Sequence, residues 1–304
     1  TAAGTGVITL GDSDTGVTVA SSATIGGAST GTITLGAATL ADSATLTVGT
    51  GIANTISLSS VTGTALGSAS HLTINTTGAV TVSGAVGTDI GTITITNSGG
   101  TTFSSTVDAA TVTITSTSVG NAVSFNGNLN LSSGMTVGAG AAAYNVAING
   151  SSNTIAGTTT FANTGTVTLG NGSDTVNFTG GVVATAPSAI TVNGTMTAAG
   201  TGVITLGDSD TGVTVASSAT IGGASTGTIT LGAATLADSA TLTVGTGIAN
   251  TISLSSVTGT ALGSASHLTI NTTGAVTVSG AVGTDIGTIT ITNSGGTTFS
   301  STVD

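Results

Sequence analysis

Short runs in which Ser or Thr alternates with Ile, Val or Leu recur along the whole chain. A six-residue phrase of this kind begins at Gly6, Gly31, Gly91 and Gly165. Alternation with a period of two, built from β-branched residues, is typical of β-strands. The runs end at Gly, Asn, Ser or Asp, the residues that favour turns. The pattern therefore predicts many short strands, and no stretch has the apolar spacing of an α-helix.

The same alternation predicts which side chains form the core. In residues 92–96 the isoleucines should point inward and the threonines outward, because successive side chains of a strand lie on opposite faces. Thr32 and Thr34, which flank Ile33, should likewise be exposed. Applied to five runs, this reasoning predicts nine buried residues: Ile8, Leu10, Ile33, Leu35, Ile93, Ile95, Ile114, Val167 and Leu169.

Strand spacing favours a coiled β architecture. The runs begin roughly every 8–15 residues, too close together for βαβ units of at least ~30 residues. Sandwich domains usually centre on large aromatic side chains, but the chain has only five Phe, one Tyr and no Trp. We therefore expect an all-β fold, a parallel β-helix (β-solenoid) built from short Thr/Val/Ile strands with roughly 20–25 residues per coil. Tandem β-sandwich repeats are the alternative.

A long exact repeat organises the chain. Residues 1–108 recur without a change as residues 197–304. We expect residues 1–196 to form one full repeat unit of a β-solenoid, and residues 197–304 to form a partial second repeat. An open end of a solenoid exposes unpaired backbone groups that can template a further strand. The predicted partner is therefore the protein itself, through self-association along a fibre axis with further copies or repeats.

The composition removes several classes of function. The chain has no Lys, no Arg and no Cys, and its 11 acidic residues give a formal charge of −11. Without cations there is no patch for nucleic acid or for an anionic membrane surface. No apolar run approaches the 18 or so residues needed to span a bilayer, so membrane insertion is not expected. No small-molecule substrate is expected either.

One segment has the form of a calcium-binding motif. Residues 170–178, GNGSDTVNF, approximate the nonapeptide G-G-x-G-x-D-x-U-x, and GDSDTGVTV at Gly11 is a looser relative. An ordinary Asn-Gly or Asp turn between strands is the other reading of both segments. If a cation binds, the expected ligands are Asp12, Asp14 and Asp174, and the expected ion is calcium, which prefers carboxylates. No other cofactor is expected.

Neither the histidines nor the threonines indicate an enzyme. His71 and its copy His267 are the only histidines, and no nucleophile-elbow motif accompanies them. Thr-x-Thr runs, of the kind that solenoidal ice-binding proteins display, occur at irregular intervals. A binding face would need these runs to align on one side of the coil at equal rise. The runs begin at Thr32, Thr45, Thr92, Thr94, Thr111 and Thr166.

Several segments of the chain resemble a known family. The runs GTITLG, TVTITSTSVGN, NLNLSSG and GNGSDTVNFTGG are similar to the β-strand-repeat regions of giant bacterial surface proteins, including filamentous-haemagglutinin-like adhesins. The resemblance covers the whole chain in style and composition. It implies a right-handed parallel β-helix that serves as an exported stalk, filament or adhesin.

These observations predict a non-enzymatic extracellular structural protein of the cell surface. Its solenoid repeats would stack into a fibre, sheath or adhesin stalk. The alternative is an adhesive binding module, either a surface adhesin or an ice-binding protein that uses a threonine face. A carbohydrate-active β-helix enzyme is a third hypothesis, and it would need a cleft with clustered acids and aromatic side chains.

Overall fold

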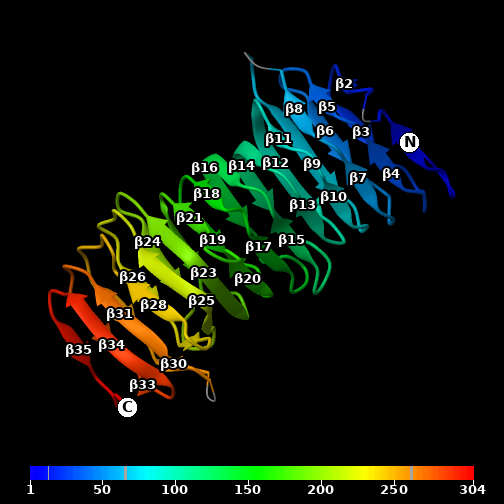
Figure 1. Cartoon of the computed structure of the whole chain (residues 1–304). Coiled ribbons are helices and arrows are strands. Elements are labelled where there is room, and N and C mark those ends of the chain that lie inside the picture. Colours follow the sequence, from blue (N-terminus) through cyan, green and yellow to red (C-terminus); the bar gives the residue numbers. More distant parts are fainter. Residues whose placement is uncertain (13, 65–66, 261–262) are drawn as a thin grey trace. The chain divides into compact units, whose positions relative to one another are not determined.

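The protein is a β-solenoid whose strands pair in parallel, as the sequence predicts (Figure 1). The computed structural model describes residues 1–12, 14–64, 67–260 and 263–304, and none of these residues lies in a helix. No element of this described part is therefore a helix that could cross a membrane. The chain divides into two compact units, Thr1–Gly150 and Ser151–Asp304.

In the first unit each coil contributes strands to three faces, which we name A, B and C. Face A contains β1 (Ile8–Leu10), β4 (Ile33–Leu35), β7 (Ile56–Leu58), β10 (Val80–Val82), β13 (Thr101–Phe103), β15 (Ala122–Phe125) and β17 (Asn145–Ile148). Face B contains β2 (Val17–Val19), β5 (Ala38–Leu40), β8 (Val61–Gly63), β11 (Val86–Gly87) and the first parts of β14 (Val107–Ile114) and β16 (Leu129–Val137). Face C contains β3 (Ala23–Ile25), β6 (Thr45–Val48), β9 (Ser70–Asn75), β12 (Ile90–Asn97) and the remaining parts of β14 and β16.

The second unit also has three faces, and we letter each one by the copies of first-unit strands that it holds. Face A contains β19 (Thr159–Phe161), β22 (Gly181–Ala184), β24 (Val203–Leu206), β26 (Ile229–Leu231), β29 (Ile252–Leu254), β32 (Val276–Val278) and β35 (Thr297–Phe299). Face B contains β20 (Thr166–Leu169), the first parts of β23 (Ala189–Ala198) and β25 (Val213–Gly222), β27 (Ala234–Leu236), β30 (Val257–Gly259) and β33 (Val282–Gly283). Face C contains β18 (Ser152–Ile155), β21 (Thr175–Phe178), the remaining parts of β23 and β25, β28 (Thr241–Val244), β31 (Ser266–Asn271) and β34 (Ile286–Asn293).

The core of each unit is a set of aliphatic ladders inside the coil. On face C of the first unit one ladder runs through five buried side chains in register: Leu46, Leu72, Ile93, Val112 and Met135. A slip of one residue would turn every side chain of a strand to the other face. Burial of the ladder therefore fixes the register of the strands.

Seven of the nine predicted core residues are buried; of the two flanking threonines, Thr34 is exposed and Thr32 is half-buried. The prediction is wrong for Ile8, which is half-buried, and for Leu10, which is 41% exposed. Their strand, β1, pairs on one side only, with β4. The copy of Leu10, Leu206, lies in register with Ala184 on one side and Leu231 on the other and is fully buried. Burial therefore depends on cover from both neighbouring coils as well as on the alternation.

Four phenylalanine side chains join the core as two ring pairs. The rings of Phe103 and Phe125 are parallel, with centroids 5.0 Å apart. Phe161 and Phe178 pack edge to face at 6.3 Å. All four rings are buried, and so is Tyr144. These five aromatic side chains thus fill the interior of the coils, while Phe299 in β35 is half-buried.

Some corners of the coil require glycine because two backbones meet there. A Cβ on Gly78 would lie 1.8 Å from the carbonyl oxygen of Asn54, and a Cβ on its copy Gly274 would lie equally close to that of Asn250. Real Cβ atoms do not approach an oxygen so closely, so only glycine fits. Glycine at these corners therefore allows consecutive coils to stack at strand spacing.

Candidate functional site

Asp12 closes its own turn. Its Oδ1 accepts hydrogen bonds from the backbone N–H groups of Asp14, at 2.9 Å, and Thr15, at 2.7 Å. These two N–H groups, Asp14 first, hold the pKa of the Asp12 carboxyl below its ordinary value. The copy in the second unit, Asp208, accepts from Asp210 and Thr211 in the same way. The carboxylate at this position acts as the acceptor of an Asx turn.

Asp174 has a similar role in the second unit. Its Oδ2 accepts the backbone N–H of Asn171 at 2.7 Å, and its own carbonyl accepts the N–H of Thr195 at 2.7 Å. Asp174 is 9% exposed, and Gly194 packs against its backbone. Residues 170–174, GNGSD, therefore form a closed turn that leads into β21. Asp174 belongs to the second unit, while Asp12 and Asp14 belong to the first.

The three aspartates predicted as calcium ligands thus lie in two separate turns. Within the described ranges, no three His, Asp or Glu side chains come close enough to hold a metal ion. Each carboxylate whose contacts are given above bonds to backbone N–H groups of its own turn. The turn interpretation of these segments therefore fits the geometry better than the calcium interpretation does.

We expect an excess of chelator to leave the melting temperature of the protein unchanged, since a ligand bound only to the folded state would raise it. Melting curves followed by circular dichroism, with added calcium and with chelator, would test this. A clear fall in melting temperature with chelator, reversed by calcium, would favour Asp12, Asp14 and Asp174 as calcium ligands.

His71 lies on a strand of face C and accepts a hydrogen bond from the backbone of the neighbouring strand. It is half-buried in β9, and its Nδ1 accepts the N–H of Thr92 at 3.1 Å. Gly91 forms a bulge in β12 at this point, so that Ile90 and Thr92 pair with consecutive residues of β9. The imidazole thereby provides an acceptor for the Thr92 N–H next to the bulge. In the second copy, His267 Nδ1 lies 2.8 Å from the hydroxyl of Thr288.

Face C of the first unit displays a continuous column of threonines. The six residues of this column are paired strand to strand in register: Thr24, Thr47, Thr73, Thr94, Thr113 and Thr136. A second column, two residues back along each strand, contains Thr45, His71, Thr92 and Thr111. Thr111 donates a 3.0 Å hydrogen bond to Thr92 within this second column. Two adjacent columns make face C a two-dimensional array of threonine side chains that is interrupted by His71.

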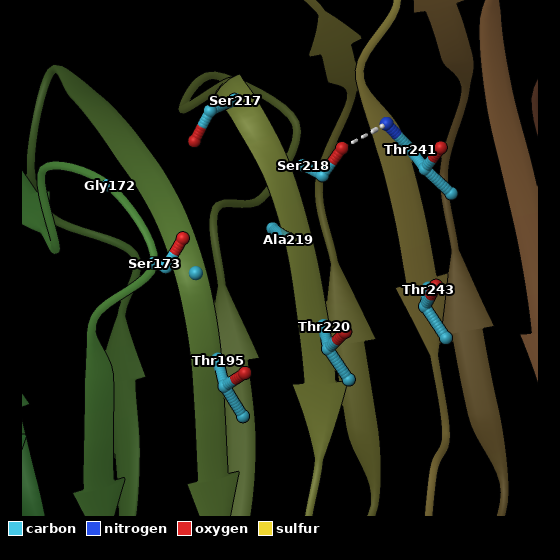
Figure 2. Close-up of a pocket in the computed structure, with 10 residues that line it drawn as sticks. Gly172, Ser173, Thr195, Ser217, Ser218, Ala219, Thr220, Thr241 and Thr243 are labelled. Carbon is cyan, nitrogen blue, oxygen red and sulfur yellow. Dashed lines mark hydrogen bonds between the residues drawn. The ribbon is translucent and has the colours of Figure 1, made fainter.

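The second unit carries the same column on its own face C. Its members are Thr175, Thr195, Thr220, Thr243, Thr269 and Thr290, again paired in register. Figure 2 shows Thr195, Thr220 and Thr243 on neighbouring strands with their side chains pointing the same way. They line a shallow groove of about 320 Å³ together with Ser173 and Ser217.

Faces A and B carry single columns. The column on face A of the first unit comprises Thr9, Thr34, Ser57, Thr81, Thr102 and Ser124. On face B, Thr18, Thr39 and Thr62 are followed by Gly87 and Asp108. The strands of these two faces are mostly three residues long, so each presents one outward hydroxyl. Face C is therefore the widest threonine surface of the unit.

The sequence alone did not predict this alignment. Successive threonines of the first column are 23, 26, 21, 19 and 23 residues apart, an irregular series. The corners absorb the difference in coil length, and the register of the buried ladder places the threonines one above another. The signal that could have revealed it is the constant phase of each threonine relative to its flanking buried residues. No family model, curated protein or solved structure matches this chain.

Proposed function

We propose that the chain is a non-enzymatic, extracellular structural repeat protein. Its solenoid repeats join end to end into a cell-surface fibre, sheath or adhesin stalk. The observation that carries this proposal is the junction between the two copies of the repeat at residues 196 and 197, which lies wholly inside the second unit.

The junction has no break in the coil. Strand β23 runs through it, and Thr195, Met196 and Thr197 pair with Thr220, Ile221 and Gly222 of β25. On the other side the same strand pairs with β21. The first coil of the following repeat is thus stacked on the last coil of the preceding one with ordinary ladder spacing.

The preceding repeat also completes the core of the following one. Ile204 and Leu206 are fully buried beside Val182 and Ala184 of the preceding repeat. Their copies at the first coil, Ile8 and Leu10, have no such cover and are half-buried and exposed. Stacking of repeats therefore gains buried apolar area at each junction, which is the nearest-neighbour stabilisation of solenoid arrays.

The composition agrees with a role outside the cell. Small residues, which cost the cell little to synthesise, suit a protein that is exported in large amounts. The absence of Lys and Arg removes every cleavage site for trypsin-like proteases. The resemblance to repeat regions of bacterial surface adhesins points in the same direction. Self-association along the fibre axis is the partner interaction that we propose.

Chains lengthened by one and by two further 196-residue repeats should form rods that grow by a constant increment. With about eight to ten coils per repeat and a rise of about 4.8 Å per coil, the increment should be roughly 40–48 Å. Low-dose electron images and solution scattering would measure it. Compact particles whose largest dimension does not grow with repeat number would contradict the fibre proposal.

A further inference from the structure

Face C has a regular geometry in two directions. Along the solenoid axis, paired threonines of neighbouring strands repeat at about 4.8 Å, and along each strand the two columns are about 6.7 Å apart. The strands β3, β6, β9 and β12 lie side by side in Figure 1, in the order given by their pairing. The spacing is set by backbone hydrogen bonds, so the array is held rigidly.

The hydroxyls of the longer column are available to solvent. Within the described part of the chain, Thr47, Thr73, Thr94 and Thr113 are only half-buried, and their hydroxyls make no hydrogen bond to protein. Each threonine hydroxyl has one donor and two acceptor positions. Each threonine side chain carries a methyl group beside its hydroxyl. The face therefore offers hydrogen-bonding groups and small methyl groups, repeated at the spacing of the strands.

The residue types on face C limit the kinds of partner that it can bind. The outward residues of its described strands in the first unit are Thr, Asn, Ser, Gly, Ala and one His, with no Asp, although the chain has a formal charge of −11. A charged partner has no counterpart on this face, since the acidic residues lie elsewhere. A sugar ring has no aromatic platform, because Phe103, Phe125 and Tyr144 are buried. What fits is a neutral lattice of hydrogen-bond donors and acceptors with order in two dimensions.

We propose that face C binds ice, whose surface is such a lattice of water molecules. Ordered water next to the threonine hydroxyls would join the crystal, and the methyl groups would occupy gaps in it. Each contact is weak, but a rigid array makes many contacts at once and loses little conformational freedom on binding. This activity goes beyond the structural role proposed above and would give the solenoid a lateral binding surface in addition to its end-to-end contacts.

The test uses the whole 304-residue chain and one substitution placed in both units. Thr73→Lys combined with Thr269→Lys puts a long charged side chain inside the six-threonine column of each unit, at the third position in the first unit and at the fifth in the second. Thr81→Lys combined with Thr277→Lys places the same charges at equivalent positions on face A. The readouts are the gap between melting and freezing of a seeded ice crystal and the shape of that crystal.

The unmodified chain and the face A variant should both lower the freezing temperature of the seeded crystal below its melting temperature (thermal hysteresis) and should both give it facets. The face C variant should lose both effects. Thr73→Tyr with Thr269→Tyr, which stays neutral and favours strands, should lose them as well, with an unchanged melting temperature of the protein. The proposal is overturned if the unmodified chain leaves ice growth unaffected, or if the face A and face C variants lose activity equally. It is also overturned if no variant changes ice growth and the face C substitutions abolish only self-association or binding to a neutral polysaccharide.

Discussion

Replacing Ile95 by alanine should lower the free energy of unfolding by about 2–5 kcal/mol, whereas the same replacement at Ile291 should cost at most about 1 kcal/mol. The two isoleucines are copies of one position and have identical neighbours in sequence. Ile95 is fully buried between Ile74 and Ile114. Ile291 pairs only with Ile270 and is 47% exposed. Only the buried position leaves a cavity when the side chain is shortened.

Denaturant unfolding followed by circular dichroism would measure the two losses. Because solenoids can unfold in parts, hydrogen exchange of the amides in β12 and β34 should be measured as well, to report the local stability at each position. Here Ile291→Ala is the matched control, since it removes the same atoms from the same sequence. Equal losses at the two positions would show that cover from the next coil does not govern the stability of the ladder.

The second large effect should appear at alkaline pH, through Tyr144. Its ring is buried, with Gly140 packed against it, and its hydroxyl donates a 2.6 Å hydrogen bond to the carbonyl of Gly138. Burial raises the pKa of the Tyr144 phenol from 10.0 to about 12. The folded state therefore keeps the proton over a pH range in which the unfolded chain releases it. This preference stabilises the fold fully below about pH 10 and is lost as the pH rises toward about 12.

Between these two pH values the free energy of unfolding should fall by about 2–3 kcal/mol, at about 1.4 kcal/mol per pH unit. The chain makes this measurement clean, since it has a single Tyr and no Lys, Arg or Cys that could titrate in the same range. Thermal melting at a series of pH values would follow the loss, and ultraviolet absorbance would report the tyrosinate. Tyr144→Phe is the control and should abolish the pH dependence. An equally steep dependence in that variant would disprove the assignment to Tyr144.

The local pattern of the sequence was sufficient to predict the fold class. Alternation of Ile93 and Ile95 with threonines specifies strands with one buried face, because the period of two leaves no other arrangement for the apolar side chains. Short strands separated by turn residues, together with a core poor in aromatics, distinguished a solenoid from a sandwich. The exact recurrence of residues 1–108 likewise indicated a tandem array, because identical segments favour the same strands and turns.

The interactions of single side chains at the corners depended on the tertiary structure. The motif around Asp174 has the spacing of a calcium repeat, yet the carboxylate of Asp174 bonds to the N–H of Asn171 in its own turn. Sequence spacing shows which carboxylate oxygens are present, but the hydrogen-bond donors that lie next to them are set by the folded turn. Leu10 and Leu206 have the same sequence around them, and only the strand that covers Leu206 makes it part of the core.

The threonine array of face C also depended on the tertiary structure. Along the chain, Thr47, Thr73 and Thr94 are separated by 26 and then 21 residues, so no fixed period connects them. Parallel pairing of the buried residues beside them brings them into one column, and the corners take up the unequal lengths. The sequence thus determined that threonines face outward, because strand alternation is local. Their alignment follows from register between coils, which is set by burial of the whole ladder.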